Sequence, residues 1–148
     1  MKKSSLQLEH YHYTKLLLEV NADYQADKEP ENSVYFIPNA KAIKTTIRLQ
    51  KVVNQEDAKQ PLYALELSFS CDDAAFPYVF SVGLMAFVMC EETLAEEIEQ
   101  HQHRLVVNAV SMLFSAVREQ LLTLSARHQY GPMMLPSLDF RSLAEQKS

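Results

Sequence analysis

Glycine and cysteine are both scarce in this chain, with two residues of each among 148. Phosphate-binding loops and dinucleotide-binding folds need several glycines, because the backbone there must approach phosphate closely. Cys71 and Cys90 are too few for a disulfide framework, and by themselves they form no zinc site. We therefore expect a protein of the reducing cytoplasm that carries no cofactor.

Long apolar runs and excess positive charge are also missing. The longest uncharged stretch, Phe76 to Cys90, is shorter than the ~20 residues of a membrane-spanning helix. Residues 1–15 lack the apolar run of a signal peptide. Lys and Arg number 14 against 19 Asp and Glu, a net charge of -5 that repels phosphate backbones. We expect neither membrane insertion nor nucleic-acid binding.

Four stretches have the pattern of strands, within what we interpret as a single domain spanning residues 1–148. Apolar and polar residues alternate most clearly from Leu62 to Cys71 and again from Lys41 to Val53. Phe76 to Cys90 is apolar on both faces. Leu6 to Val20 alternates imperfectly, which predicts a bulge or contacts on both sides. Consecutive strands joined by short turns predict an antiparallel sheet.

A long helix is predicted from Thr93 to Arg127, where Thr93 and Glu96 form a capping-box pattern. Its middle is apolar nearly all round, so it needs a cover on two sides. We expect this chain's sheet on one side and a second copy on the other. The predicted oligomer interface comprises Leu105, Val106, Ala109, Val110, Leu113, Phe114 and Val117. With a short helix over Leu138 to Ala144, the predicted fold is α+β: a four-stranded antiparallel sheet covered by one long helix and a short C-terminal helix.

Apolar residues also gather in segments predicted to be loops. Tyr35, Phe36 and Ile37 lie in the first long loop, and Met133, Met134 and Leu135 follow the long helix. One account is that these loops fold over the core and simply pack. The other is an adaptable apolar groove, because methionine is flexible and suits promiscuous binding surfaces. The residues alone leave both accounts open, packing on the core and an apolar groove.

Catalytic and metal chemistry have little support. His10 and His12 share a strand face, but no third ligand accompanies them, and zinc sites use three or four. His101 and His103 are two apart on a helix and point in different directions. The paired carboxylates fall in turns and helix starts. We expect no metal site and no enzyme activity.

Residues near the carboxyl end resemble the SecB family of export chaperones. The matching positions are Leu113-Phe114, Arg118-Glu119, Arg127, Tyr130, Leu135, Leu138-Asp139-Phe140 and Leu143, with His103 and Leu105 upstream and Tyr13-Thr14-Lys15 near the start. The resemblance covers nearly the whole chain. It implies a homotetramer, built as a dimer of dimers, that holds unfolded polypeptides in long grooves without using ATP. The implied client-groove residues are Phe36, Ile37, Phe76, Met133, Leu135, Leu138 and Phe140.

This chain also departs from the family pattern. His128 and Gly131 stand where the family has Gly and Pro, and Leu16 and Val20 stand where the family has acidic residues that dock the translocase motor SecA. The first departure predicts another path for the loop, and the second argues against SecA docking. The main hypothesis is therefore an ATP-independent chaperone that binds unfolded or preprotein chains for export. The alternative is a SecB-like adaptor dedicated to one partner, such as an antitoxin.

Overall fold

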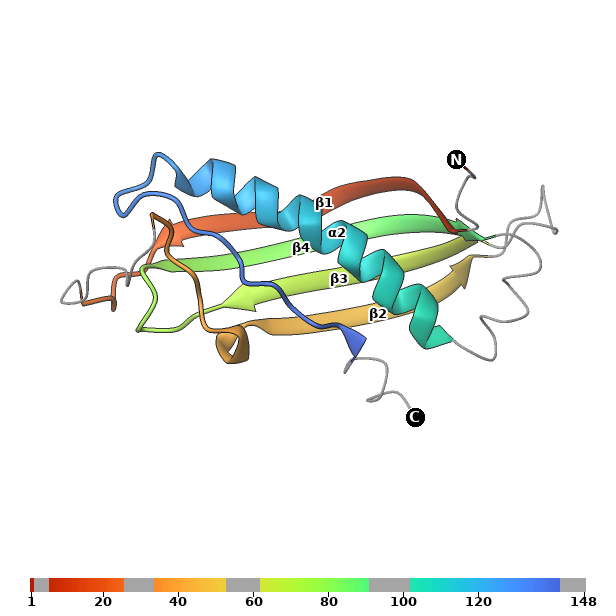
Figure 1. Cartoon of the computed structure of the whole chain (residues 1–148), viewed down its shortest axis with the longest axis horizontal. Helices are drawn as coiled ribbons and strands as arrows, with labels where there is room; N and C mark the ends of the chain where they lie inside the picture. The colour runs from red at the N-terminus through yellow and green to blue at the C-terminus, as the bar shows by residue number, and fades with distance from the viewer. Residues whose placement is uncertain (2–5, 26–33, 53–61, 91–101, 142–148) are drawn as a thin grey trace.

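The computed structural model describes residues 1, 6–25, 34–52, 62–90 and 102–141. These residues form an α+β fold, with a four-stranded antiparallel sheet and one long helix that crosses one face of the sheet obliquely (Figure 1). The elements are β1 (Leu6–Val20), η1 (Ala40–Ala42), β2 (Lys44–Val52), β3 (Leu62–Cys71), β4 (Tyr78–Cys90) and α2 (Gln102–Ser125). The predicted fold class is confirmed.

Strand order in the sheet is β1-β4-β3-β2, so β1 and β2 form opposite edges. The predicted bounds of β1 and β3 are confirmed. β2 begins three residues later than predicted, because Asn39 accepts a hydrogen bond from the Lys41 amide and starts the 3-10 turn η1. β4 begins at Tyr78 instead of Phe76, which lies in the preceding turn and donates its amide to Asp73 O.

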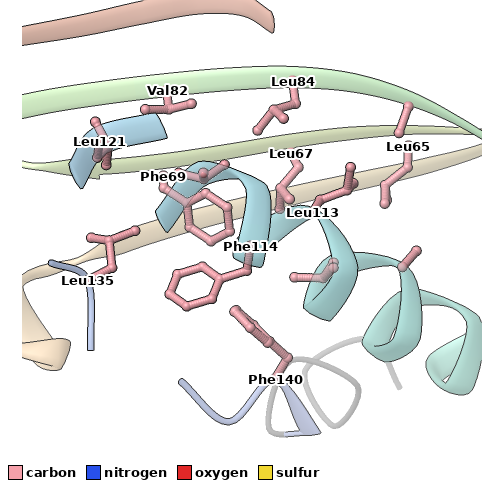
Figure 2. Packing of buried hydrophobic residues seen from close by; sticks show 14 of the residues in the cluster. Leu65, Leu67, Phe69, Val82, Leu84, Leu113, Phe114, Leu121, Leu135 and Phe140 are labelled. Carbon is pink, nitrogen blue, oxygen red and sulfur yellow. The ribbon is translucent and has the colours of Figure 1, made fainter. Parts of the chain in front are cut away.

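The core lies between the sheet and α2. On β3 the buried residues are the alternate positions predicted from sequence, Tyr63 to Cys71, and β4 supplies the next row. The ring of Phe114 on α2 lies 5.4 Å from that of Phe69 and 5.2 Å from that of Phe140 (Figure 2). Aromatic edge-to-face contacts of this kind add to the stability from burial alone. The C-terminal segment therefore belongs to the same core as the helix.

Two register shifts in β1 explain its irregular alternation. Pairing with β4 skips Glu9 and Thr14, as β-bulges do. Each skipped residue reverses the parity of the chain after it. Tyr11 and Tyr13 therefore lie on the same face as Leu8 and Leu16, not on the opposite face as strict alternation requires. The predicted bulge is confirmed.

The outward side of α2 carries more exposed polar residues than predicted. Asn108, Ser111, Ser115 and Glu119 are exposed along it, with Met112 the exposed apolar residue. The Ser111 and Ser115 hydroxyls donate to helix carbonyls one turn back, so they are satisfied without a second cover. The expectation that this helix has almost no polar face is wrong, because small polar residues recur at its outward positions.

The ends of the two predicted helices lie partly outside the described residues. α2 is described from Gln102, so the predicted cap at Thr93 is not covered. In the region of the predicted short C-terminal helix, Leu138 and Asp139 have no regular structure. Of the described residues 138–141, Arg141 is the helical one. The predicted residues 142–144 are outside the described part.

Candidate functional site

Two segments far apart in sequence meet beside the carboxyl end of α2. The Phe36 amide donates to Pro132 O at 3.1 Å, and the Met134 amide donates to Phe36 O at 2.9 Å. These bonds make a parallel bridge between Phe36 and Met133. The first apolar loop and the segment after the helix therefore form one surface.

Side chains from the sheet and helix hold this surface in place. The Tyr78 hydroxyl donates to Gly131 O at 2.6 Å and accepts from the Tyr130 amide at 3.1 Å. Burial raises the pKa of Tyr78, which keeps its hydroxyl able to donate. The buried Ser125 hydroxyl accepts from the Met133 amide at 2.8 Å. Gly131 has a φ of 79°, a conformation that favours glycine at this turn.

Three half-buried aromatic rings lie on this surface. The ring of Tyr24 lies 6.5 Å from that of Phe36 and 5.2 Å from that of Tyr130, and the rings of Phe36 and Tyr130 are 6.3 Å apart. All three ring contacts are edge to face. Each ring is only half-buried, so part of its surface is accessible to a ligand. We call these three rings with exposed Val34 and Ile37 the loop cluster.

The buried side-chain amide of Asn21 holds the chain close to Tyr24 in place. The Asn21 side chain donates to Asp73 O at 2.9 Å and Phe76 O at 3.1 Å, and it accepts from the Asp23 amide. These bonds tie the end of β1 to the turn between β3 and β4. The loop cluster is therefore positioned by the sheet and not only by its own loop.

The seven predicted groove residues divide into two groups. Phe76, Met133, Leu135 and Phe140 are buried in the core, at 0–6% exposure. Phe36 and Leu138 are half-buried, and Ile37 is 48% exposed. The first group packs in the core of the protomer. The side chains of the second group are at least partly accessible to a ligand. Sequence reasoning missed Tyr24, since only contacts across the fold bring it beside Phe36.

The structure places most residues of the predicted oligomer interface in the core of a single protomer. Val106, Ala109, Val110, Leu113, Phe114 and Val117 are buried within a single protomer, where they pack on its own sheet. The side chain of Leu105 lies outside the described part. Outside the loop cluster, four exposed apolar residues lie on these two elements: Tyr11, Leu16 and Val20 on β1, and Met112 on α2. We call these four residues the β1 flank.

The described part of the chain holds few groups suited to metal chemistry. The rings of His10 and His12 lie 5.4 Å apart, and no three His, Cys, Asp or Glu residues within the described ranges converge on a point. Within the same ranges, no helix has the length and apolar character to cross a membrane.

Comparisons with known proteins identify similar folds. No protein-family model matches the chain, and no curated protein matches it. A protein of unknown function from Streptococcus agalactiae has a TM-score of 0.62 at 14% identity, over 90% of this chain and 97% of that one. A SecB-like chaperone from Mycobacterium tuberculosis, in complex with a peptide from the antitoxin HigA1, has a TM-score of 0.42 at 11% identity, over 90% and 91%. The first likeness shows a shared fold, and the second carries no argument.

Proposed function

We propose that this protein is an ATP-independent chaperone that binds non-native polypeptide segments in the cytoplasm, without enzyme activity. The observation that carries the proposal is the loop cluster, in which exposed Val34 and Ile37 lie within two residues of Phe36 in the chain. The ring of Phe36 contacts those of Tyr24 and Tyr130, and its backbone is hydrogen-bonded to Pro132 and Met134. Exposed apolar side chains beside aromatic rims are typical of polypeptide-binding surfaces. The carboxyl-terminal resemblance to SecB supports the same role, including service to protein export. SecA docking is not part of the proposal.

Binding at one loop cluster is expected to be weak. A client segment that removes ~300 Å² of apolar surface from water gains roughly 7 kcal/mol. The loss of translational and rotational freedom offsets ~4 kcal/mol or more of this. Several sites acting together would raise the affinity without a new contact. We therefore propose that the working form is a homo-oligomer, as the SecB resemblance implies with its dimer of dimers, that presents several loop clusters.

The proposed contact between copies is the β1 flank. Its four apolar side chains are 37–42% exposed and lie beside an edge strand. An edge strand offers unpaired backbone groups as well as side chains to another chain. We propose this surface because most of the helix residues predicted for the interface are buried within one protomer.

The proposal is tested by light scattering of a chemically unfolded client diluted into buffer with the protein at equal concentration. We expect the protein to slow aggregation and Ile37→Ser to weaken the effect several-fold, because Ile37 is exposed and its loss leaves the core intact. Lys41→Ser is the control, since it shortens an exposed, charged side chain in the adjoining turn η1 without removing a large apolar side chain. Unchanged aggregation of several clients would refute the chaperone role.

A second candidate is an adaptor dedicated to one partner such as an antitoxin. It is favoured by exposed Leu16 and Val20 at positions where the SecB family carries acidic residues. Purification from native cells distinguishes the two. One stoichiometric partner, together with no effect on client aggregation, supports the adaptor, whereas many sub-stoichiometric clients support the general chaperone.

A further inference from the structure

The two histidines of β1 lie between its two bulges. The first bulge skips Glu9, immediately before His10. The second skips Thr14, two residues after His12. Between them the imidazoles project from one face of the sheet, and their partner positions on β4 alternate with residues buried in the core. The first bulge therefore directs both histidines to the face turned away from α2.

The two imidazoles have the spacing of ligands that share one metal ion. Their ring centres are 5.4 Å apart. A metal lies about 2.0 Å from a ring nitrogen that binds it, and therefore about 3.2 Å from the ring centre. Two rings that share a metal at a tetrahedral or trigonal angle then have centres about 5.2–5.5 Å apart. His10 and His12 are exposed, and neither ring is hydrogen-bonded to another described residue, so their nitrogens are open to a metal.

The neighbouring strand supplies a third donor, the thioether of Met85. Met85 pairs directly with His12 in the β1–β4 ladder, where the Cβ atoms of opposite residues lie about 4.5–5.5 Å apart. Its side chain is half-buried on the same face and is not part of the core cluster. Because Met85 is far from His12 in the sequence, only the register of the sheet brings this donor to the histidine pair.

The chemistry of the donors indicates which metal they suit. A thioether is a soft ligand that selects Cu(I), and imidazole also binds copper well. Zinc sites are built instead from thiolates, imidazoles and carboxylates. Among the described residues, no cysteine or carboxylate joins the two histidines. Half-buried Phe87, the partner of His10, adds an apolar neighbour that limits the access of water to a bound ion.

We propose that His10, His12 and Met85 bind one Cu(I) ion on the face of the sheet turned away from α2. Each imidazole binds the ion through one ring nitrogen, and Met85 completes a three-coordinate site through its sulfur. The site is separate from the loop cluster and the β1 flank, and it does not rest on the chaperone proposal. Either proposal can therefore fail while the other holds.

Competition with bicinchoninate, a chelator that changes colour when it binds Cu(I), measures the affinity of the site. The untagged protein is titrated with ascorbate present and oxygen excluded. We expect each chain to take one Cu(I) ion from the chelator. Zn(II) at equal concentration should not displace it, because a thioether favours Cu(I). Failure to take Cu(I) from the chelator, or its displacement by Zn(II), overturns the proposal.

Two methionines of β4 give a matched pair of variants. Met85→Leu keeps the size of the side chain and removes the sulfur. It should weaken Cu(I) binding about tenfold or more, the loss expected when even a supporting residue of a metal site is removed. Met89→Leu makes the same change on the same face, opposite Gln7 instead of a histidine, and should change the affinity less than about twofold. Equal effects of the two variants overturn the proposal.

X-ray absorption at the copper edge identifies the ligands directly. The Cu(I)-loaded protein should show nitrogen and sulfur ligands. Met85→Leu should lose the sulfur and His12→Gln should lose a nitrogen, whereas Ile37→Ser in the loop cluster should change neither. Nitrogen ligands alone in the unchanged protein, or sulfur that persists in Met85→Leu, would exclude Met85 as the thioether ligand and overturn the proposal.

Discussion

At the scale of single residues, the close pair Thr14 and Gly83 shows how one bulge needs one glycine. Thr14 is unpaired in the β1–β4 ladder, and its hydroxyl occupies the space above Gly83. Sequence alternation indicates that β1 is irregular, but not which residues are skipped. The pairing with β4 shows which residue is skipped: Tyr13 pairs with Leu84 and Lys15 with Gly83, so Thr14 is left out.

The first prediction follows from that contact. Gly83→Ala should destabilise the protein by about 1 kcal/mol, because the new Cβ must displace the Thr14 side chain. Urea denaturation measures the loss. In a Thr14→Ala background the same substitution should cost less, since the obstructing hydroxyl is gone. An equal cost in both backgrounds would show that the strain arises elsewhere.

The second prediction concerns the bidentate pair of Asp139 and Arg141. Hydrogen bonds from the guanidinium lower the pKa of the Asp139 carboxyl from 3.8 to about 2. A lowered folded-state pKa stabilises the folded state above about pH 4, and this contribution is lost as the pH falls through about 2. Both side chains are largely exposed, so the effect on stability is small.

The pKa itself is the sharper measurement for this pair. Arg141→Gln should raise the pKa of Asp139 toward its ordinary value, as followed by NMR titration of the side-chain carboxyl. Arg127→Gln is the control, because Arg127 is exposed and makes no described ion pair with Asp139. A pKa of Asp139 that stays unchanged in Arg141→Gln would contradict the pair as its cause.

At the scale of elements, the long helix α2 is present as predicted, and its apolar side packs on the sheet of the same chain. The apolar positions of the helix are sufficient to predict a long helix, yet their burial is satisfied by one sheet. Spacing alone could not show that Ser111 and Ser115 satisfy themselves on the outward side. The methionine-containing segment lies partly in the core, because Met133 and Leu135 are fully buried and the Met133 amide donates to the Ser125 hydroxyl.

The third prediction tests how that segment is held. Tyr78→Phe removes a hydroxyl that bonds both Gly131 O and the Tyr130 amide, and it should destabilise the protein by about 1–2 kcal/mol. Hydrogen exchange at Tyr130 should become faster, since its amide loses its partner. Tyr11→Phe is the matched control, because Tyr11 is exposed on β1. Unchanged exchange at Tyr130 would contradict the anchoring role.

At the scale of the whole molecule, the described residues include two exposed apolar surfaces, the loop cluster and the β1 flank. Sequence reasoning found Phe36 and Ile37 because apolar residues are unusual in loops. It also singled out Leu16 and Val20, which stand where the SecB family has acidic residues, but the exposure of Tyr11 and Met112 came only from the structure. Leu16 and Val20 are 40% and 37% exposed on this edge strand.

The fourth prediction concerns assembly through the β1 flank. Leu16→Glu should reduce the mass measured by native mass spectrometry, because a carboxylate in an apolar contact between copies is poorly solvated. Leu17→Glu introduces the same charge at the next residue, whose side chain lies on the face of the sheet turned away from α2, and should leave the mass unchanged. A monomer of the unchanged protein at micromolar concentration would contradict the homo-oligomer.

The sequence by itself determined the four strands, the long helix, the inward face of β3 and the irregularity of β1. These features depend on local periodicity, which one segment carries alone. Tertiary structure decided the order β1-β4-β3-β2, the residues skipped in β1, and which apolar side chains remain exposed. Those outcomes depend on contacts between segments far apart in the chain, and burial is a property of such contacts and not of any one residue.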